Sequence, residues 1–499
     1  MSPIMLFSCI IIYFVILLIV ANRTGKNSNN ESFFIGNRSS NWMLVAFGMI
    51  GTSLSGVTFV SVPGAVSREA FAYFQVAIGY LIGYALIAFV LLPLYYRLNL
   101  TSIYNYLSTR FGFNSYKTGS AFFLLSRTLG ATARLYLVVE ILQFSILSSL
   151  GVPFWLTTVI ILIMILLYTY KGGVKTIVWT DTLQTSCMLA GLVICVVYIL
   201  NKMGISFGDS VSQIKEKGYG KMFYTDVNSK LFFLKQILAG AFITVTMTGM
   251  DQEMMQKNLS VRTLKDSQKN VITMSLVLTG VLLLFLFLGG LLYLYAGQQN
   301  ISVTGDKLFP EIALHHMPPI ISVIFIIALI SALFPSADGA ITALTSSFCI
   351  DILGMKRRED WSEVEKKNIR QRIHLTVAFI FLIFVLIFKW VNSPSMIGVI
   401  LKVAAYTYGP LLGLFSFGIL TTRKVIDKFV PVACIISPVI CFFLDKYQKE
   451  IFGKYEIGLE LLIINGLLTF IGLFLISKPI LISAEVKNIL HHGISKPVS

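Results

Sequence analysis

A few ionisable side chains stand inside long apolar stretches of this sequence, where charged residues are rare. They are Arg127, Arg134, Asp181, Asp338 and Lys402. An ionised side chain at the centre of a bilayer costs roughly 2.5–3.5 kcal/mol on insertion scales, so it usually faces a polar pathway or a charged partner. We therefore expect these residues to surround a route for ions or charged solutes.

The apolar stretches themselves predict an all-α, polytopic membrane protein. About thirteen of them, each of roughly 18–25 residues, are long enough to carry a helix across the hydrocarbon. Of the 499 residues, 56% are apolar and 13% are charged, against about 25% charged in soluble domains. Because the loops are short, we treat residues 1–499 as one membrane domain. The predicted spans are 3–21, 42–64, 73–96, 118–147, 154–170, 178–201, 232–253, 270–297, 319–351, 371–391, 394–420, 429–445 and 456–477.

The distribution of Lys and Arg predicts the orientation of the chain. The net charge of +16 comes largely from loops, so we interpret it as a topology determinant and not as a nucleic-acid surface. Basic loops stay in the cytoplasm under the positive-inside rule. We accordingly predict an external N-terminus and a cytoplasmic C-terminus. The basic loops are 22–41, 97–117, 171–175, 254–269, 352–372 and 422–428, followed by the tail.

The motifs of common enzyme classes are absent from this sequence. It contains no P-loop, no nucleophile elbow and no H-E-x-x-H zinc motif. None of the six cysteines shows C-x-x-C spacing, and the histidines lack a metal-binding spacing. We therefore predict a protein that is not an enzyme.

Two predicted spans contain runs of weak helix formers. In 42–64 the run from Gly48 to Gly56 is rich in Gly and Ser, and in 232–253 Thr and Gly residues precede Asp251. Unwound backbone at membrane depth survives only where it lines a cavity or is buried in protein, and its carbonyls can then bind a cation. Close packing of helices through small residues is the alternative. Two interrupted spans, each leading a set of five, predict a 5+5 inverted-repeat core with broken first and sixth core helices.

Six segments follow one another between about residues 30 and 420. They read ESFFIGNRSSNW, TSLSGVTFVSVPG, LTSIYNYLSTRFG, GGVKTIVWTDTLQ, MDQEMMQKNLS and YGPLLGLFSFGI. In this order they resemble the motifs of the sodium:solute symporter family. The resemblance implies a sodium-coupled secondary active symporter, which imports a small polar or anionic organic solute of the sugar, sialic acid or carboxylate type by alternating access.

The resemblance also implies the boundaries of the two repeats and the binding partners of the protein. Residues 1–41 are then an extra N-terminal helix and linker, 42–201 the first repeat, 202–231 an external loop, 232–421 the second repeat, and 422–499 two accessory helices with a short cytoplasmic tail. The expected partners are Na+, a small-molecule solute and the lipid bilayer of the cell inner membrane, without nucleic acid or an obligatory protein partner. Two alternatives stay open: a proton-coupled symporter of the same fold, and a non-transporting sensor or regulatory protein built on it.

By resemblance, the principal Na+ lies between the first and eighth core helices. The implied ion ligands are Gly51, Leu54, Ala332, Ser336, Asp338 and Asp181. The family's usual pair of hydroxyl ligands reads Pro335-Ser336 here, so one hydroxyl is missing, and Pro335 is expected to kink its helix. Asp338 stands where relatives have Ser or Thr, and it can replace the lost ligand, shift the ion or bind a proton. A structural ion pair is the alternative for Asp338, and a helix cap is the alternative for Asp181.

The resemblance places the solute beside the first core helix. The implied solute-binding residues are Ser53, Ser55, Thr58, Gln75, Arg134 and Lys402. The small hydroxyl side chains can equally be packing residues, and Lys402 can bind an anionic solute or extend outward to the membrane interface. An arginine can hold a carboxylate in a bidentate manner. Pairing with Glu140 or Asp251 is the alternative for Arg134.

Overall fold

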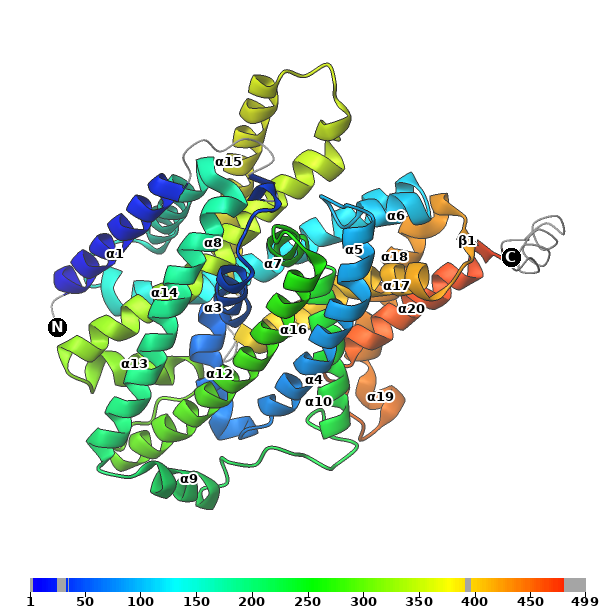
Figure 1. Ribbon diagram of the computed structural model, residues 1–499. Helices are drawn as coiled ribbons and strands as arrows, with labels where there is room; N and C mark the ends of the chain where they lie inside the picture. The colour runs from blue at the N-terminus through cyan, green and yellow to red at the C-terminus, as the bar shows by residue number, and fades with distance from the viewer. Residues whose placement is uncertain (1–2, 25–32, 35, 391–395, 480–499) are drawn as a thin grey trace, which may run out of the picture.

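The computed structural model describes residues 3–24, 33–34, 36–390 and 396–479, and helices dominate them (Figure 1). Long apolar runs form helices because every backbone polar group in lipid must find its hydrogen-bond partner inside the segment. Most of the predicted cytoplasmic tail, 480–499, and part of the predicted N-terminal linker, 25–32, lie outside the described residues.

The described elements differ mainly in length. The long helices are α1 (Pro3–Thr24), α3 (Trp42–Glu69), α4 (Tyr73–Leu86), α7 (Phe113–Leu142), α8 (Phe154–Met203), α12 (Leu264–Gln298), α14 (Pro319–Ser347), α15 (Glu363–Phe388), α18 (Val430–Lys446) and α20 (Leu461–Leu475). The shorter helices are α5 (Leu92–Arg97), α6 (Asn105–Arg110), α9 (Phe207–Glu216), α10 (Phe233–Thr244), α11 (Gln252–Leu259), α13 (Leu308–His315), α16 (Met396–Thr407), α17 (Gly409–Leu420) and α19 (Gln448–Phe452). Short 3-10 helices are η1 (Gly36–Arg38), η5 (Gly305–Lys307), η7 (Met355–Arg357) and η8 (Asp427–Phe429). Short π-helices are η2 (Ile87–Leu91), η3 (Gln143–Leu147), η4 (Val245–Gly249) and η6 (Phe348–Ile352). Strand β1 (Lys424–Val425) pairs antiparallel with β2 (Ser477–Lys478).

Side-chain caps mark the starts of several long helices. The Asn41 side chain accepts a hydrogen bond from the Met43 amide at 2.8 Å where α3 begins. Thr263 caps α12 in the same way, and Ser362 opens α15 in a reciprocal capping box. Such caps satisfy amides that have no partner within the first turn of a helix.

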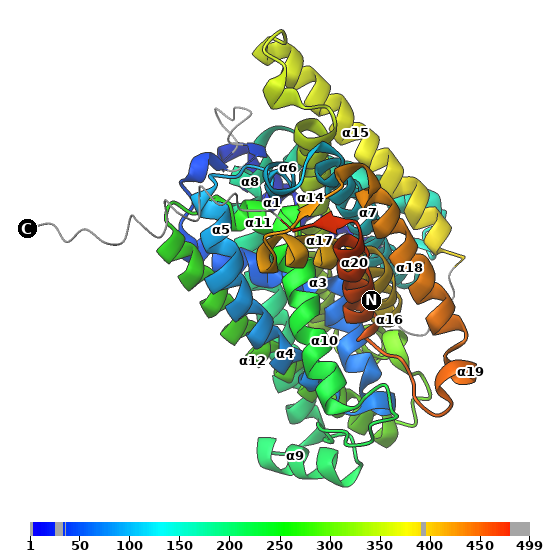
Figure 2. The ribbon, with the colours of Figure 1, turned by 90° about the vertical axis from the view of Figure 1, so that its right-hand side faces the viewer.

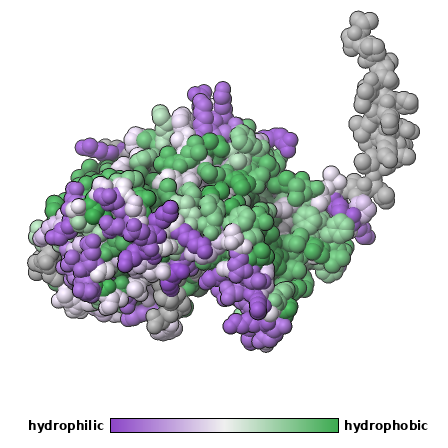
Figure 3. Space-filling model, turned by 90° about the horizontal axis from the view of Figure 1, so that it is seen from below, coloured by the Kyte–Doolittle hydropathy of each residue, from purple (hydrophilic) through white to green (hydrophobic). Residues whose placement is uncertain are grey.

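The prediction of an all-α, polytopic membrane protein is confirmed. Nine of the described helices are long and apolar enough to cross a bilayer, and two bent helix pairs raise this number to eleven. Two shorter apolar helices, Phe154–Tyr170 and Leu461–Leu475, accompany them. Every predicted span overlaps one of these segments, while the number of crossings stays a prediction. A view from the end that carries α9 shows broad hydrophobic surface beside hydrophilic clusters (Figure 3).

The helices form two groups that meet at α3. In one group α4 packs against α10 and α12; in the other α14 packs against α7, α8 and α15. Helix α3 contacts α12 in the first group and both α8 and α14 in the second. It therefore lies in the seam between the groups.

The basic loops gather at the end of the molecule opposite α9 (Figures 1 and 2). There Arg38 donates to the Leu100 carbonyl at 3.0 Å, and Lys356 donates to the Thr101 hydroxyl at 2.7 Å. At the α9 end the Phe71 amide donates to the Lys221 carbonyl at 3.0 Å. The loops predicted to be cytoplasmic thus share one end, as the positive-inside rule requires. Which side of a membrane this end faces stays a prediction.

Both predicted breaks are present. Helix α3 contains Ser55 at φ 52° and ψ 165°, far from helical values. The segment Phe233–Gly249 meets Gln252–Leu259 at an angle of 66°. Asp251 caps the second part of this bent pair, since its side chain accepts hydrogen bonds from the two amides that follow Gln252. The inverted symmetry of the two repeats stays a prediction.

Helix α14 does not break at its internal proline. It continues as one helix from Pro319 to Ser347 through Pro335. A proline inside a helix removes one backbone hydrogen bond and crowds the preceding turn. Helix α14 packs against α8 and α3, and these contacts stabilise its helical backbone around Pro335.

Ser55 occupies a backbone region that is costly for any residue except glycine. We expect Ser55→Gly to raise the free energy of unfolding by about 1 kcal/mol, because relief of strain exceeds the entropy that glycine adds to the unfolded chain. Thermal unfolding of the purified protein in detergent measures the change. Ser53→Gly, two residues earlier in regular helix, is the control and should lower stability by roughly 0.5–1 kcal/mol. A Ser55→Gly variant less stable than the wild type would contradict the interpretation.

Candidate ion and solute site

The broken turn of α3 lies directly against α14 and α8. A Cβ atom on Gly51 would fall 3.6 Å from Pro335 Cγ and 3.4 Å from Thr185 Cβ. Gly56, one turn later, faces the Leu333 backbone of α14 at 3.7 Å. Glycine at these positions allows the two backbones to approach closely, as in other packed membrane helices.

This turn leaves backbone carbonyls without their regular partners. A helical carbonyl accepts from the amide four residues later, so the non-helical backbone at Ser55 disturbs this pairing for the carbonyls of Thr52, Ser53 and Leu54. On the neighbouring helix α14, Ala332 and Ser336 are buried, and the Ser336 hydroxyl donates to the Leu333 carbonyl at 2.9 Å. The Ser336 oxygen keeps its lone pairs. The predicted principal ion ligands thus stand on two facing segments, a chemistry that suits a small alkali cation.

Asp181 pairs with a lysine that the sequence analysis placed in a loop. Lys257 Nζ lies 2.8 Å from Asp181 Oδ2 and 2.8 Å from the Thr52 hydroxyl. Glu253 Oε1 lies 3.6 Å from the same nitrogen. Asp181 is therefore inside α8 as one partner of an ion pair, and it does not cap a helix.

Asp338 faces the same group of charges from α14. Tyr168 donates to its Oδ2 at 2.8 Å, and Asp338 lies within electrostatic range of Asp181 and Lys257. Its other oxygen is buried without a hydrogen-bond partner among the described residues. Asp338 thus combines a fixed carboxylate with one free oxygen.

A second buried ion pair shares Glu253 of α11 with this cluster. Arg127 of α7 pairs with Glu253, and its Nε stands 3.9 Å from Asp251 Oδ2. Tyr408 donates to the same oxygen of Asp251 at 2.8 Å. Helix α11 is therefore tied to α7, α8 and the start of α17 by charged or polar contacts. The position of α11 is set by these pairs.

Lys257 and Glu253 are not among the site residues predicted from the sequence, because the apolar run ends near residue 253. The predicted loop 254–269 is partly wrong: its first turn belongs to α11, and the Lys257 side chain is 2% exposed. The four-residue spacing of Glu253 and Lys257 on one helix face was a usable signal.

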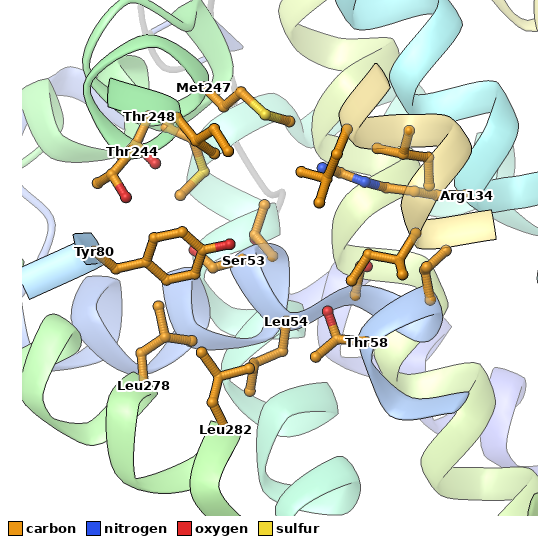
Figure 4. Close-up of a pocket in the computed structure, with 18 of the residues that line it drawn as sticks. Ser53, Leu54, Thr58, Tyr80, Arg134, Thr244, Met247, Thr248, Leu278 and Leu282 are labelled. Atoms are coloured by element: carbon orange, nitrogen blue, oxygen red, sulfur yellow. The ribbon is translucent and has the colours of Figure 1, made fainter. Parts of the chain in front are cut away.

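A small cavity of about 90 Å3 opens beside the same turn of α3. The predicted residues Ser53, Ser55, Thr58 and Arg134 line it. Figure 4 shows Arg134 reaching into the cavity opposite Tyr80, with Ser53 and Thr58 contributed by α3. The cavity therefore combines hydroxyl groups with one guanidinium.

Arg134 forms no hydrogen bond or ion pair within the described part of the chain. The alternative partner Asp251 is occupied by Arg127 and Tyr408. Arg134 is half-buried, and an unpaired cation that is partly removed from water is costly unless a ligand or water completes it. The cavity can thus accept an anionic group.

Two predicted solute-binding residues lie outside this cavity. The side-chain amide of Gln75 donates to the Leu231 carbonyl at 3.1 Å and accepts from the backbone amide of Tyr224. Gln75 therefore stabilises the loop that follows α9. Lys402 lies 2.7 Å from Asp445, and its side chain is 60% exposed. Tyr73, Tyr80 and Tyr84, which the sequence analysis did not select, line the cavity instead.

The pair of Arg127 and Glu253 gives a stability prediction. Arg127→Met removes the hydrogen-bonded partner of the buried Glu253 carboxylate, which keeps only the longer contact to Lys257, and should lower the free energy of unfolding by about 3–5 kcal/mol. Adding Glu253→Leu should restore much of the loss, because both charges are then gone. A thermal double-mutant cycle in detergent measures this. The exposed pair of Lys269 and Asp266, 4.0 Å apart, is the control, and Lys269→Ala should cost less than about 1 kcal/mol. Additive effects at the buried pair would contradict the interpretation.

Comparisons with known proteins identify the family of this chain. The sequence profile described as the Sodium:solute symporter family matches residues 33–425. The chain is 24% identical to the Sodium/sialic acid symporter SiaT of Proteus mirabilis, with 89% of this chain and 90% of that protein covered. It is 25% identical to Sodium-coupled monocarboxylate transporter 1 of Mus musculus, over 79% of this chain and 65% of that protein.

A solved structure shares the fold. It is described as the substrate-bound, outward-open state of a Na+-coupled sialic acid symporter, and it superposes with a TM-score of 0.81 at 19% identity. The superposition covers 95% of this chain and 99% of the other. The proteins named in these comparisons are membrane transporters and not enzymes. From the profile match over most of its length, this chain is a multi-pass membrane transporter that belongs to the sodium:solute symporter family.

Proposed function

We propose that this protein is a sodium-coupled symporter that imports a small carboxylated solute by alternating access. The observation that carries the proposal is the unpaired Arg134 guanidinium in a cavity beside the broken turn of α3. A guanidinium binds a carboxylate through two parallel hydrogen bonds. The hydroxyl groups of Ser53, Ser55 and Thr58 can bind the polar remainder of the solute.

The sodium ion is proposed to bind on the other side of the same turn. Its ligands there are the carbonyls of Gly51 and Leu54 with Ala332 and Ser336 of α14. Ion and solute then share one short segment of backbone, so each affects the affinity for the other, and the effect is reciprocal. Each positive charge that enters down a membrane potential of about 100 mV, inside negative, contributes about 2.3 kcal/mol.

The proposed route of the solute runs along the second half of α3. A second cavity shares Tyr73 and Leu401 with the first and extends to Glu69 and Lys230 near the α9 end. With the basic loops in the cytoplasm of the cell inner membrane, this end faces outward. The repeats 42–201 and 232–421, with an external N-terminus, complete the proposed topology.

The relatives support a carboxylated solute and leave its identity open. One is named for sialic acid and another for monocarboxylates. Both kinds of compound carry a carboxylate, which is the group that Arg134 suits. Relatives at about this level of identity can differ in the rest of the solute.

Transport in proteoliposomes tests the coupling ion. We expect uptake of radiolabelled sialic acid or a short monocarboxylate to require an inward Na+ gradient. Asp338→Asn should lower the rate, because Asp338 lies among the charges beside the proposed ion site. The control replaces Na+ with choline at equal salt. Full uptake without Na+ under a pH gradient would favour the proton-coupled alternative and contradict sodium coupling.

Substitution of Arg134 tests the solute class. Arg134→Gln should weaken carboxylate binding by about 10- to 100-fold, since a charged hydrogen-bond pair contributes roughly 1.5–3 kcal/mol. The concentration of solute that gives half-maximal Na+-driven uptake measures the loss. Lys269→Gln is the control, because Lys269 lies at the exposed surface beside Asp266 and lines neither cavity. Equal effects of the two substitutions, or none at Arg134, would contradict the assignment.

A further inference from the structure

The Lys257 ammonium group has the surroundings of a bound cation. Its nitrogen lies 2.8 Å from Asp181 Oδ2, 2.8 Å from the Thr52 hydroxyl and 3.6 Å from Glu253 Oε1. These oxygen atoms come from α8, α3 and α11, and the lysine side chain is 2% exposed. Carboxylate and hydroxyl oxygens are also the ligands that a hard metal cation takes.

This position is distinct from the proposed sodium site. The sodium ligands are carbonyls at the break of α3 and groups on α14, whereas Lys257 contacts the Thr52 side chain and Asp181 on α8. A Cβ atom on Gly48 would fall 3.0 Å from Asp181 Cβ, so Asp181 packs about two turns before the break. Two neighbouring positions along α3 can therefore each hold a positive charge.

Negative charge exceeds positive charge around Lys257. Asp181, Glu253 and Asp338 converge there, and Glu253 packs against Gly339, the residue after Asp338. Each of the three carboxylates has one buried oxygen without a hydrogen-bond partner among the described residues. Without the lysine, these oxygens would form a strong site for a free cation, because unpaired buried carboxylates are costly.

We propose that Lys257 is a tethered cation, whose ammonium group takes the place of a second free cation at Asp181. One free sodium ion then suffices for the cycle. This inference rests on the proposed function, since it assumes a separate sodium site at the break of α3. A lysine suits the task because its ammonium group is a compact point charge on a flexible stem.

The tether has consequences for transport. Lys257 belongs to α11 and Asp181 belongs to α8, so their ion pair joins one segment from each of the two proposed repeats, 232–421 and 42–201. Any step that separates α11 from α8 must break this pair. A tethered charge also stays with the protein, so it adds nothing to the net charge that the membrane potential drives inward.

Equilibrium binding of radioactive sodium to the purified full-length protein in detergent tests the proposal. We expect one ion per wild-type protein and two per Lys257→Ala protein, since the substitution opens the site at Asp181. The double variant Lys257→Ala with Asp181→Asn should return to one ion, because the vacated carboxylate is gone. Lys235→Ala is the matched control: Lys235 is also a buried lysine, 3.7 Å from Glu460 at the other end of the molecule, and its loss should leave one ion.

The outcomes separate this inference from the proposed function. Two ions on the wild type would overturn the tethered cation, even if the single variant fails to fold. One ion on both the wild type and a folded Lys257→Ala variant would also overturn it, and would leave a purely structural ion pair. A wild type that binds no sodium, beside a Lys257→Ala variant that binds one, would support the tether and contradict sodium coupling in the native protein.

Discussion

A charge buried at membrane depth must be paired, and this requirement organises the centre of the molecule. Lys257 with Asp181 and Arg127 with Glu253 are ion pairs that join segments far apart in the chain. Removal from water makes an unpaired ion very costly, so these pairs hold α11 in place after its bend. Arg134 is the contrast, because it faces the cavity without a partner within the described residues. The buried Lys257 and Arg127 thus have partners within the protein, whereas the half-buried Arg134 leaves its guanidinium open to a ligand.

The break in α3 interrupts the regular hydrogen bonds of the helix, and backbone carbonyls that lose their partners there can bind an ion. Such backbone is stable in a membrane only where protein surrounds it or it lines a cavity. Here α8 and α14 cover one side, and the cavity with Arg134 opens on another. In the proposed function the same turn contacts both the ion and the solute, which gives a direct physical path for coupling between them.

The sequence by itself determined the spans, the two breaks and the end at which the basic loops gather. These are local properties. The length of an apolar run decides whether it can span the bilayer, the Gly- and Ser-rich run around Ser55 weakens its helix, and lysines and arginines mark the loops. Four of the proposed solute-binding residues line the cavity because three of them belong to that weakened helix and the fourth is an arginine within an apolar span.

The tertiary structure alone decided which charges meet. Lys257 follows the end of an apolar run and reads as a loop residue, yet the bend at Asp251 turns it into the protein against Asp181. Lys402 lies within an apolar run, yet it points to Asp445 at the surface. The distance between side chains on different helices depends on how those helices cross and pack. Local sequence carries no measure of that distance, so it can show that a buried charge needs a partner without showing which one.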